Sequence, residues 1–159
     1  AVCLAVESET GAAAAIKWPN DVRVGGLKVS GILIETAMER WEVKHAVAGI
    51  GINANLEPER HPEIASLATS IYRVAGTRAD RTAVMVRTLE RFDELYAAVK
   101  DGCSLTERWA SRLDTLGKQV RVQWRDSVVE GKAVSDSPAA VMPGNVKTLM
   151  SQDLALLHI

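Results

Sequence analysis

Two long segments of β-type sequence, residues 28–35 and 43–53, constrain the fold of this chain more than any other feature. Both are apolar at nearly every position, which is typical of strands that are covered on both faces. The residues between them, 38–41, are expected to form the turn of an antiparallel hairpin. The sequence therefore predicts a buried hairpin at the centre of a mixed or antiparallel sheet.

Helical sequence flanks this predicted sheet. Residues 1–11 have the pattern of an apolar helix that ends at a C-terminal glycine. Asp80 is expected to cap a long amphipathic helix that ends at residues 101–102, and Ser104 is expected to cap a shorter one. Residues 56–78 contain prolines, a glycine and polar runs, which indicate a connecting loop with one helical turn around residues 64–67. The chain is thus expected to fold as an α+β protein.

In the C-terminal part of the chain, from residue 118 onward, apolar residues again recur at every second position, as in β-strands. The pattern predicts four or five short strands, with turns at residues 125–126, 135–138 and 143–144. These strands would form a small β-barrel of about 40 residues, which is small for an independent core. We therefore expect this part to pack against the first domain for stability.

Composition excludes several classes of function. The 159 residues carry 19 basic and 20 acidic side chains with the signs interspersed, so no field exists to hold a nucleic-acid backbone without specificity. No apolar run reaches the roughly 20 residues that a membrane span requires. Cys3 and Cys103 lack neighbours at metal-ligand spacing. The sequence indicates a cytoplasmic protein with no membrane partner and no protein-built metal cage.

The densest group of chemically useful residues follows the first short strand. Pro19 fixes one backbone angle, so Asn20 and Asp21 lie on a rigid support just after it. Lys28 offers a positive charge beside an apolar strand, and Gly31 would let a ligand approach the backbone. The competing interpretation is a surface hairpin with a solvated Lys28, and turn statistics alone favour it.

A second glycine-containing segment, G-I-G-I-N at residues 49–53, has no third glycine and precedes no helix, so it is neither a dinucleotide fingerprint nor a P-loop. Gly49 and Gly51 are interpreted as strand glycines that let neighbouring backbones pack closely. Asn53 keeps a functional role open, because its amide both donates to and accepts from a purine edge. The histidines show no partner pattern and are assigned no role.

Taken together and in this order, the motifs resemble those of the biotin protein ligase family. The resemblance rests on K-W-P-N-D at residues 17–21, G-L-K-V-S-G-I-L-I-E at 26–35 and G-I-G-I-N at 49–53. Residues 116–122 and 130–133 also resemble the small SH3-like domain that ends these enzymes. The resemblance implies a partial biotin/lipoate ligase catalytic domain of class II synthetase type over residues 1–115 and an SH3-like domain over 116–159.

The activity that the resemblance implies has two steps. Biotin and ATP, with Mg²⁺ accompanying the nucleotide, give biotinyl-5'-AMP and pyrophosphate. The biotinyl group then passes to a lysine of a biotin carboxyl carrier domain of the acetyl-CoA carboxylase type. The resemblance implies no DNA binding for this chain and allows a homodimer.

The same resemblance assigns roles to individual residues. Lys28 would be catalytic, bridging the biotin carboxylate and the α-phosphate, and Asp21 would be catalytic beside the adenylate and the incoming lysine. Gly31 would back the biotin pocket, while Asn20 and Asn53 would contact the ATP or the adenylate. The supporting residues would be Trp18 and Pro19.

One departure from the family pattern leaves rival interpretations. The family carries, ahead of this region, an arginine- and glycine-rich loop of G-R-G-R type, and residues 1–16 contain no arginine. We therefore expect the first part of the catalytic domain to be missing here. The alternatives are a catalytically incomplete module that binds the carrier, and a lipoate-type ligase, which shares the fold but lacks K-W-P-N-D.

Overall fold

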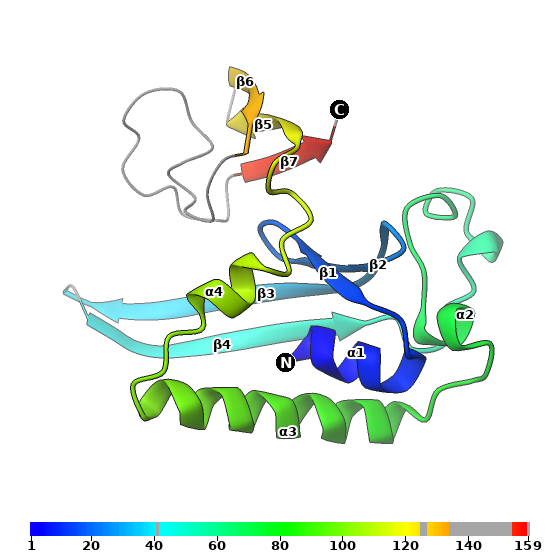
Figure 1. The fold of residues 1–159 in the computed structure, drawn as a ribbon, viewed down its shortest axis with the longest axis horizontal. Helices are drawn as coiled ribbons and strands as arrows, with labels where there is room; N and C mark the ends of the chain where they lie inside the picture. The colour runs from blue at the N-terminus through cyan, green and yellow to red at the C-terminus, as the bar shows by residue number, and fades with distance from the viewer. Residues whose placement is uncertain (41, 125–126, 134–153, 159) are drawn as a thin grey trace. The chain divides into compact units, whose positions relative to one another are not determined.

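The computed structural model describes residues 1–40, 42–124, 127–133 and 154–158 (Figure 1). The chain divides into two compact units. The first contains Ala1–Ala15 and Asn20–Cys103, and the second contains Ile16–Pro19 and Ser104–Ile159. The predicted helices and antiparallel strands are present, which confirms a mixed α+β fold. No helix within the described part combines the length and the apolar character that a bilayer span requires.

A four-stranded sheet has the order β1-β2-β3-β4; β2, β3 and β4 belong to the first unit, and β1 is divided between the two units. Its strands are β1 (Ala14–Lys17), β2 (Asp21–Val24), β3 (Leu27–Glu39) and β4 (Glu42–Ile52). The pairs β2–β3 and β3–β4 are antiparallel. The predicted turn at residues 38–41 is shorter than expected, because β3 continues to Glu39, which pairs with Glu42. Arg40 takes a φ of 57° at this reversal.

Three α-helices and one 3-10 helix complete the first unit. They are α1 (Val2–Thr10), η1 (Pro58–Arg60), α2 (Ile71–Ala75) and α3 (Arg81–Lys100). The predicted ends of α1 and α3 are confirmed: Gly11 has a left-handed φ of 68°, and the Asp80 side chain accepts hydrogen bonds from the backbone N–H groups of Thr82 and Ala83. Helix α2 lies in the segment that was predicted as a connecting loop, a few residues after the one helical turn expected at residues 64–67. Its signal was Ser70, whose hydroxyl accepts from the N–H of Arg73 as an N-cap.

The core of the first unit lies where α1, α2 and α3 meet one end of the sheet. Helix α1 packs against both α2 and α3. The buried apolar side chains include Val6 of α1, Val22 of β2, Val29 of β3, Ile71 of α2 and Val84 of α3. These side chains hold the starts of β2 and β3 in a fixed position.

The rest of the β3–β4 hairpin contradicts the prediction that both faces are covered. Residues 33–36 and 42–51 are exposed, and Leu33, Ile34 and Val47 are each more than half exposed. Apolar sequence shows that a strand needs cover, but it does not show which segment supplies it. Among the described residues, the helices cover only the end of the sheet nearest the core.

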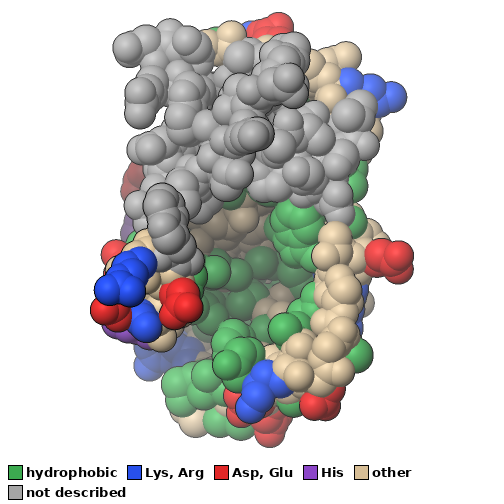
Figure 2. Space-filling model, turned by 90° about the vertical axis from the view of Figure 1, so that its left-hand side faces the viewer, with side chains coloured by type: hydrophobic (Ala, Val, Ile, Leu, Met, Phe, Trp, Pro, Cys, Tyr) green, Lys and Arg blue, Asp and Glu red, His purple; other side chains and the backbone are tan. Residues whose placement is uncertain are grey.

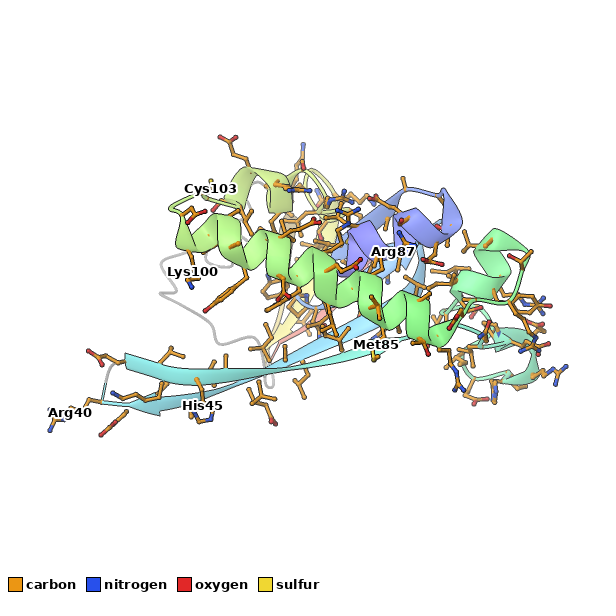
Figure 3. The ribbon with its side chains drawn as sticks, turned by 90° about the horizontal axis from the view of Figure 1, so that it is seen from below. Arg40, His45, Met85, Arg87, Lys100 and Cys103 are labelled. Atoms are coloured by element: carbon orange, nitrogen blue, oxygen red, sulfur yellow. The ribbon has the colours of Figure 1, made fainter. Side chains whose placement is uncertain are left out.

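A groove of about 380 Å³ runs between β4 and α3. Ala48, Ile50 and Ile52 line it from the strand, and Met85 and Leu89 line it from the helix. Figure 3 shows Met85 on the side of α3 that faces β4. Seen from the hairpin end, hydrophobic side chains gather on the first unit (Figure 2). This unit therefore presents apolar surface from two elements that face each other.

The second unit contains a short helix and a three-stranded antiparallel sheet in the order β6-β5-β7. Its elements are α4 (Thr106–Ala110), β5 (Gln119–Trp124), β6 (Ser127–Lys132) and β7 (Leu154–His158). The N-cap of α4 is Leu105, not Ser104 as predicted, although the Ser104 hydroxyl accepts from the N–H of Thr106. The predicted turns at 125–126, 135–138 and 143–144 lie outside the described residues.

Candidate active site

The site begins at the turn between β2 and β3. Gly25 and Gly26 have φ angles of 58° and 83°, which side chains other than glycine rarely adopt. They form a two-residue reversal, because Val24 pairs directly with Leu27. This reversal folds β3 back along β2 and brings Asp21 opposite Gly31.

A β-bulge then places Lys28 on the same face as these two residues. The register shifts between Val22 and Arg23, so that Val22 pairs with Ser30 while Arg23 pairs with Lys28. In a regular strand, residues three apart point to opposite faces, and one inserted residue reverses that relation. The Lys28 Nζ atom lies 2.5 Å from Oδ1 of Asp21. The lysine side chain is 45% exposed and the carboxylate 18% exposed, so the ion pair faces solvent mainly through the lysine.

Two further glycines extend this face. Gly51 pairs with Gly31, and Gly49 pairs with Leu33. Directly paired residues share a face, and so do residues two apart. Gly31, Gly49 and Gly51 therefore lie together on the face of the sheet that carries the ion pair, which is called the glycine face below. Figure 3 shows that His45, which shares this face of β4 by alternation, points away from α3.

The sequence analysis missed this role of Gly49 and Gly51. A Cβ atom at Gly49 would lie 3.7 Å from its nearest neighbour and one at Gly51 would lie 3.9 Å, which are ordinary contacts. The predicted close packing of backbones therefore does not explain either glycine. The signal that identifies them is the hairpin pairing, which brings both glycines beside the K-x-x-G motif at residues 28–31.

Asn53 is used differently from its predicted role. Its Nδ2 atom lies 3.1 Å from the carbonyl oxygen of Thr69 and 3.4 Å from that of Lys28, and it donates to both. The backbone N–H of Lys28 donates to the carbonyl of Leu67, and its carbonyl accepts from the N–H of Thr69. Asn53 therefore fixes the backbone that carries the lysine. A contact between Asn53 and a nucleotide stays a prediction.

The other predicted residues fall on both sides of the unit boundary. Asn20 belongs to the first unit with an exposed side chain, and its carbonyl accepts from the N–H of Ile32 at 2.9 Å. Trp18 and Pro19 belong to the second unit and are joined by a cis peptide bond. Their half-buried side chains precede Asn20 directly in the chain.

The Trp18→Ala variant is expected to lower the free energy of unfolding by about 3 kcal/mol, because a large half-buried ring is removed from the second unit. The backbone N–H of residue 18, which donates to Oγ1 of the buried Thr115 at 3.5 Å, is kept in the variant. Urea unfolding followed by far-ultraviolet circular dichroism measures the change, with the exposed Arg108→Ala as control. A loss below about 1 kcal/mol would show that Trp18 does not support the K-W-P-N-D segment.

The described residues do not fit a magnesium ion held by protein ligands alone. No group of three or more histidine, cysteine or acidic side chains is clustered among them. Asp21, the carboxylate of the site, already faces the ammonium group of Lys28.

Comparison with known proteins identifies the source of this arrangement. Residues 1–53, which include the glycine face and its lysine, match the model of the biotin/lipoate A/B protein ligase family. The chain is 31% identical to the bifunctional ligase/repressor BirA of Bacillus subtilis over 98% of this chain and 50% of that protein. It is 32% identical to the biotin–[acetyl-CoA-carboxylase] ligase of Mycobacterium tuberculosis over 73% of this chain and 40% of that protein.

A solved structure agrees with these relatives. Biotin protein ligase from Aquifex aeolicus, in complex with biotin and ATP, superposes with a TM-score of 0.77 at 28% identity, over 99% of this chain and 68% of that one. The chain belongs to the biotin protein ligase family. This family member spans about half the length, or less, of the curated relatives described above.

Proposed function

We propose that this chain is part of a biotin protein ligase, an enzyme that activates biotin with ATP and transfers it to a lysine of a carrier protein. The observation that carries the proposal is the Lys28 ammonium group held beside a face of three glycines. The exposed backbone at Gly49 and Gly51 can accept a flat ring system, with the side chain of Leu33 on the same face beside it. A single cation next to this backbone suits a carboxylate or a phosphate. The solved relative contains biotin and ATP, which agrees with both features.

In the first step, a carboxylate oxygen of biotin forms a bond to the α-phosphorus of ATP, and the bond from that phosphorus to the bridging oxygen breaks. Pyrophosphate leaves and biotinyl-5'-AMP remains. Negative charge increases on the α-phosphate oxygens during this exchange. A fixed ammonium group stabilises that charge most strongly where water is excluded, and this is the role proposed for Lys28.

In the second step, the amine of the carrier lysine forms a bond to the acyl carbon of the adenylate. AMP leaves with the bonding electrons, and the amine loses a proton. Lys28 again lies beside the phosphate that accumulates charge. Asp21 and Asn20, at the start of β2, are proposed to lie beside the adenylate and the incoming amine, and Gly31 beneath the biotin.

The finer parts of the proposal concern cofactor, domains and partner. Mg²⁺ is proposed to arrive with ATP. Residues 1–115 are proposed to belong to the catalytic domain, and 116–159 to an SH3-like domain. The partner is a biotin carboxyl carrier domain of the acetyl-CoA carboxylase type, and the reaction is proposed to take place in the cytoplasm.

The proposal is tested by incubating the protein with biotin, ATP, Mg²⁺ and a carrier domain, and measuring carrier biotinylation by mass spectrometry. A carrier whose accepting lysine is replaced by arginine is the control. One sample contains residues 1–159, and a second contains them joined to the part of the Bacillus subtilis relative that lies outside the matched region. We expect biotinylated carrier from the joined protein, and weak biotin binding with little or no turnover from residues 1–159.

Each outcome decides between the interpretations. Carrier binding without biotinylation by the joined protein would favour the module that only binds a carrier. Faster transfer of lipoate than of biotin would favour a lipoate-type ligase. Tight biotin binding and ordinary turnover by residues 1–159 would show that these residues supply the closed pocket themselves.

A further inference from the structure

The end of the Lys28 side chain borders the space that a Cβ atom at position 31 would fill, at less than an ordinary contact distance. A Cβ atom at Gly31 would lie 3.2 Å from both Cε and Nζ of Lys28, and 3.7 Å from Oδ1 of Asp21. By contrast, Gly31 has no positive φ that would itself require glycine. The reason for glycine at this position is therefore the lysine that folds across it.

Three features of the chain place the ammonium group there. The β-bulge puts Lys28 on the face of Gly31, and the missing side chain lets the lysine fold back over β3. The Asp21 carboxylate, opposite Gly31 on β2, then receives the ammonium group at 2.5 Å. A lysine has four rotatable side-chain bonds and, with 45% exposure, would otherwise sample many extended conformations.

We propose that Asp21 and Gly31 are positioning residues for Lys28: the glycine provides the space and the carboxylate provides the counter-charge that hold the ammonium group over the glycine face. The inference rests on the proposed function, since it assigns to two residues of that site a task other than direct contact with substrate. It adds that Lys28 is held at the site before any ligand binds.

The first test needs no enzymatic activity. Residues 1–159 are labelled with a trace of acetic anhydride, and the acetylation rate of each lysine is measured by mass spectrometry. Lys44, which is 48% exposed and paired with Glu39 and Glu42, is the internal reference. We expect Asp21→Asn to raise the rate at Lys28 about 3- to 10-fold relative to Lys44, because the ammonium group loses its partner.

Two glycine variants separate the space from the charge. Gly31→Ala is expected to raise the Lys28 rate as well, because the new methyl group displaces the flexible end of the lysine without forcing backbone to move. Gly131→Ala, on β6 of the second unit, is the control, since no atom lies within 4 Å of the added Cβ. Its Lys28 rate should equal that of the unmodified chain, and urea midpoints should show that all three variants fold.

The second test uses the joined protein and separates this proposal from the proposed function. Misplacing a catalytic group by about 1 Å lowers rates by about 100-fold, so Asp21→Asn and Gly31→Ala should lower kcat for adenylate formation about 10- to 100-fold with a smaller change in the KM for biotin. Unchanged labelling at Lys28 in both variants would overturn the positioning proposal, even if biotin is transferred. Altered labelling in a protein that never makes adenylate would leave the positioning intact and overturn the proposed function.

Discussion

Replacing Lys28 with alanine is expected to lower the rate of biotinyl-5'-AMP formation by about 100- to 1000-fold, which corresponds to about 3 to 4 kcal/mol of activation free energy. The ammonium group is the cation beside the glycine face, and it would lie where charge accumulates on the α-phosphate. Its loss also leaves Asp21, only 18% exposed, without the cation at 2.5 Å. The fold should survive, because the Lys28 backbone keeps its hydrogen bonds to Leu67 and Thr69.

Adenylate formation is measured as pyrophosphate exchange in the joined protein. Lys44→Ala, which removes a lysine of similar exposure from the hairpin end of the same sheet, is the control. Lys28→Arg tests whether charge alone is sufficient, because the guanidinium group is larger and planar. A near-normal rate for Lys28→Ala would remove this residue from the mechanism.

Residues 1–159 alone are expected to self-associate with increasing concentration. Leu89 on α3 and Ile34 on β3 are each 54% exposed, and the groove between β4 and α3 is lined by apolar side chains. Contiguous apolar surface of this kind is rare on soluble monomers. Strand β4 is also the last strand of its sheet in the described residues, and an edge strand offers unpaired backbone groups to a second chain.

Sedimentation velocity measures the association. Leu89→Lys should weaken it about tenfold or more, because burying one such side chain contributes about 1.5 to 3 kcal/mol. Val128→Lys is a matched control, since Val128 has the same 54% exposure but lies on β6 in the second unit. A chain that stays monomeric at high concentration, or equal weakening by both variants, would contradict the assignment of association to the β4–α3 surface.

Local sequence signals predicted the parts of this fold that depend on local chemistry. The Asp80 cap predicted the start of α3, and residues 101–102 predicted its end. Helix α2 was missed because its five residues are too few for a periodic pattern. The exposure of the β3–β4 hairpin was not predicted, because it depends on whether other segments pack against the strands and not on the sequence of the strands themselves.

The candidate site was predicted in part for the same reason. The motif identified Lys28, Asp21 and Gly31, which are close in sequence and joined by one tight turn. It did not show that Gly49 and Gly51 share their face, because this depends on the register of a hairpin more than ten residues long on each side. Nor did it show that Asn53 binds the backbone of Lys28, because that contact spans 25 residues.

The two-sided backbone pairing of Lys28 also bears on how much the chain length can vary nearby. The chain leaves β4 at Asn53 and comes back to the backbone of Lys28 at Leu67 and Thr69. Both ends of the loop formed by residues 54–66 are therefore hydrogen-bonded to strand β3. Residues 61–63, at the far side of this loop, are exposed. Doubling the length of a flexible loop costs only about 0.6 kcal/mol of closure entropy. Insertions at residues 61–63 are therefore expected to leave the lysine in place, which makes these residues a suitable position for a reporter tag.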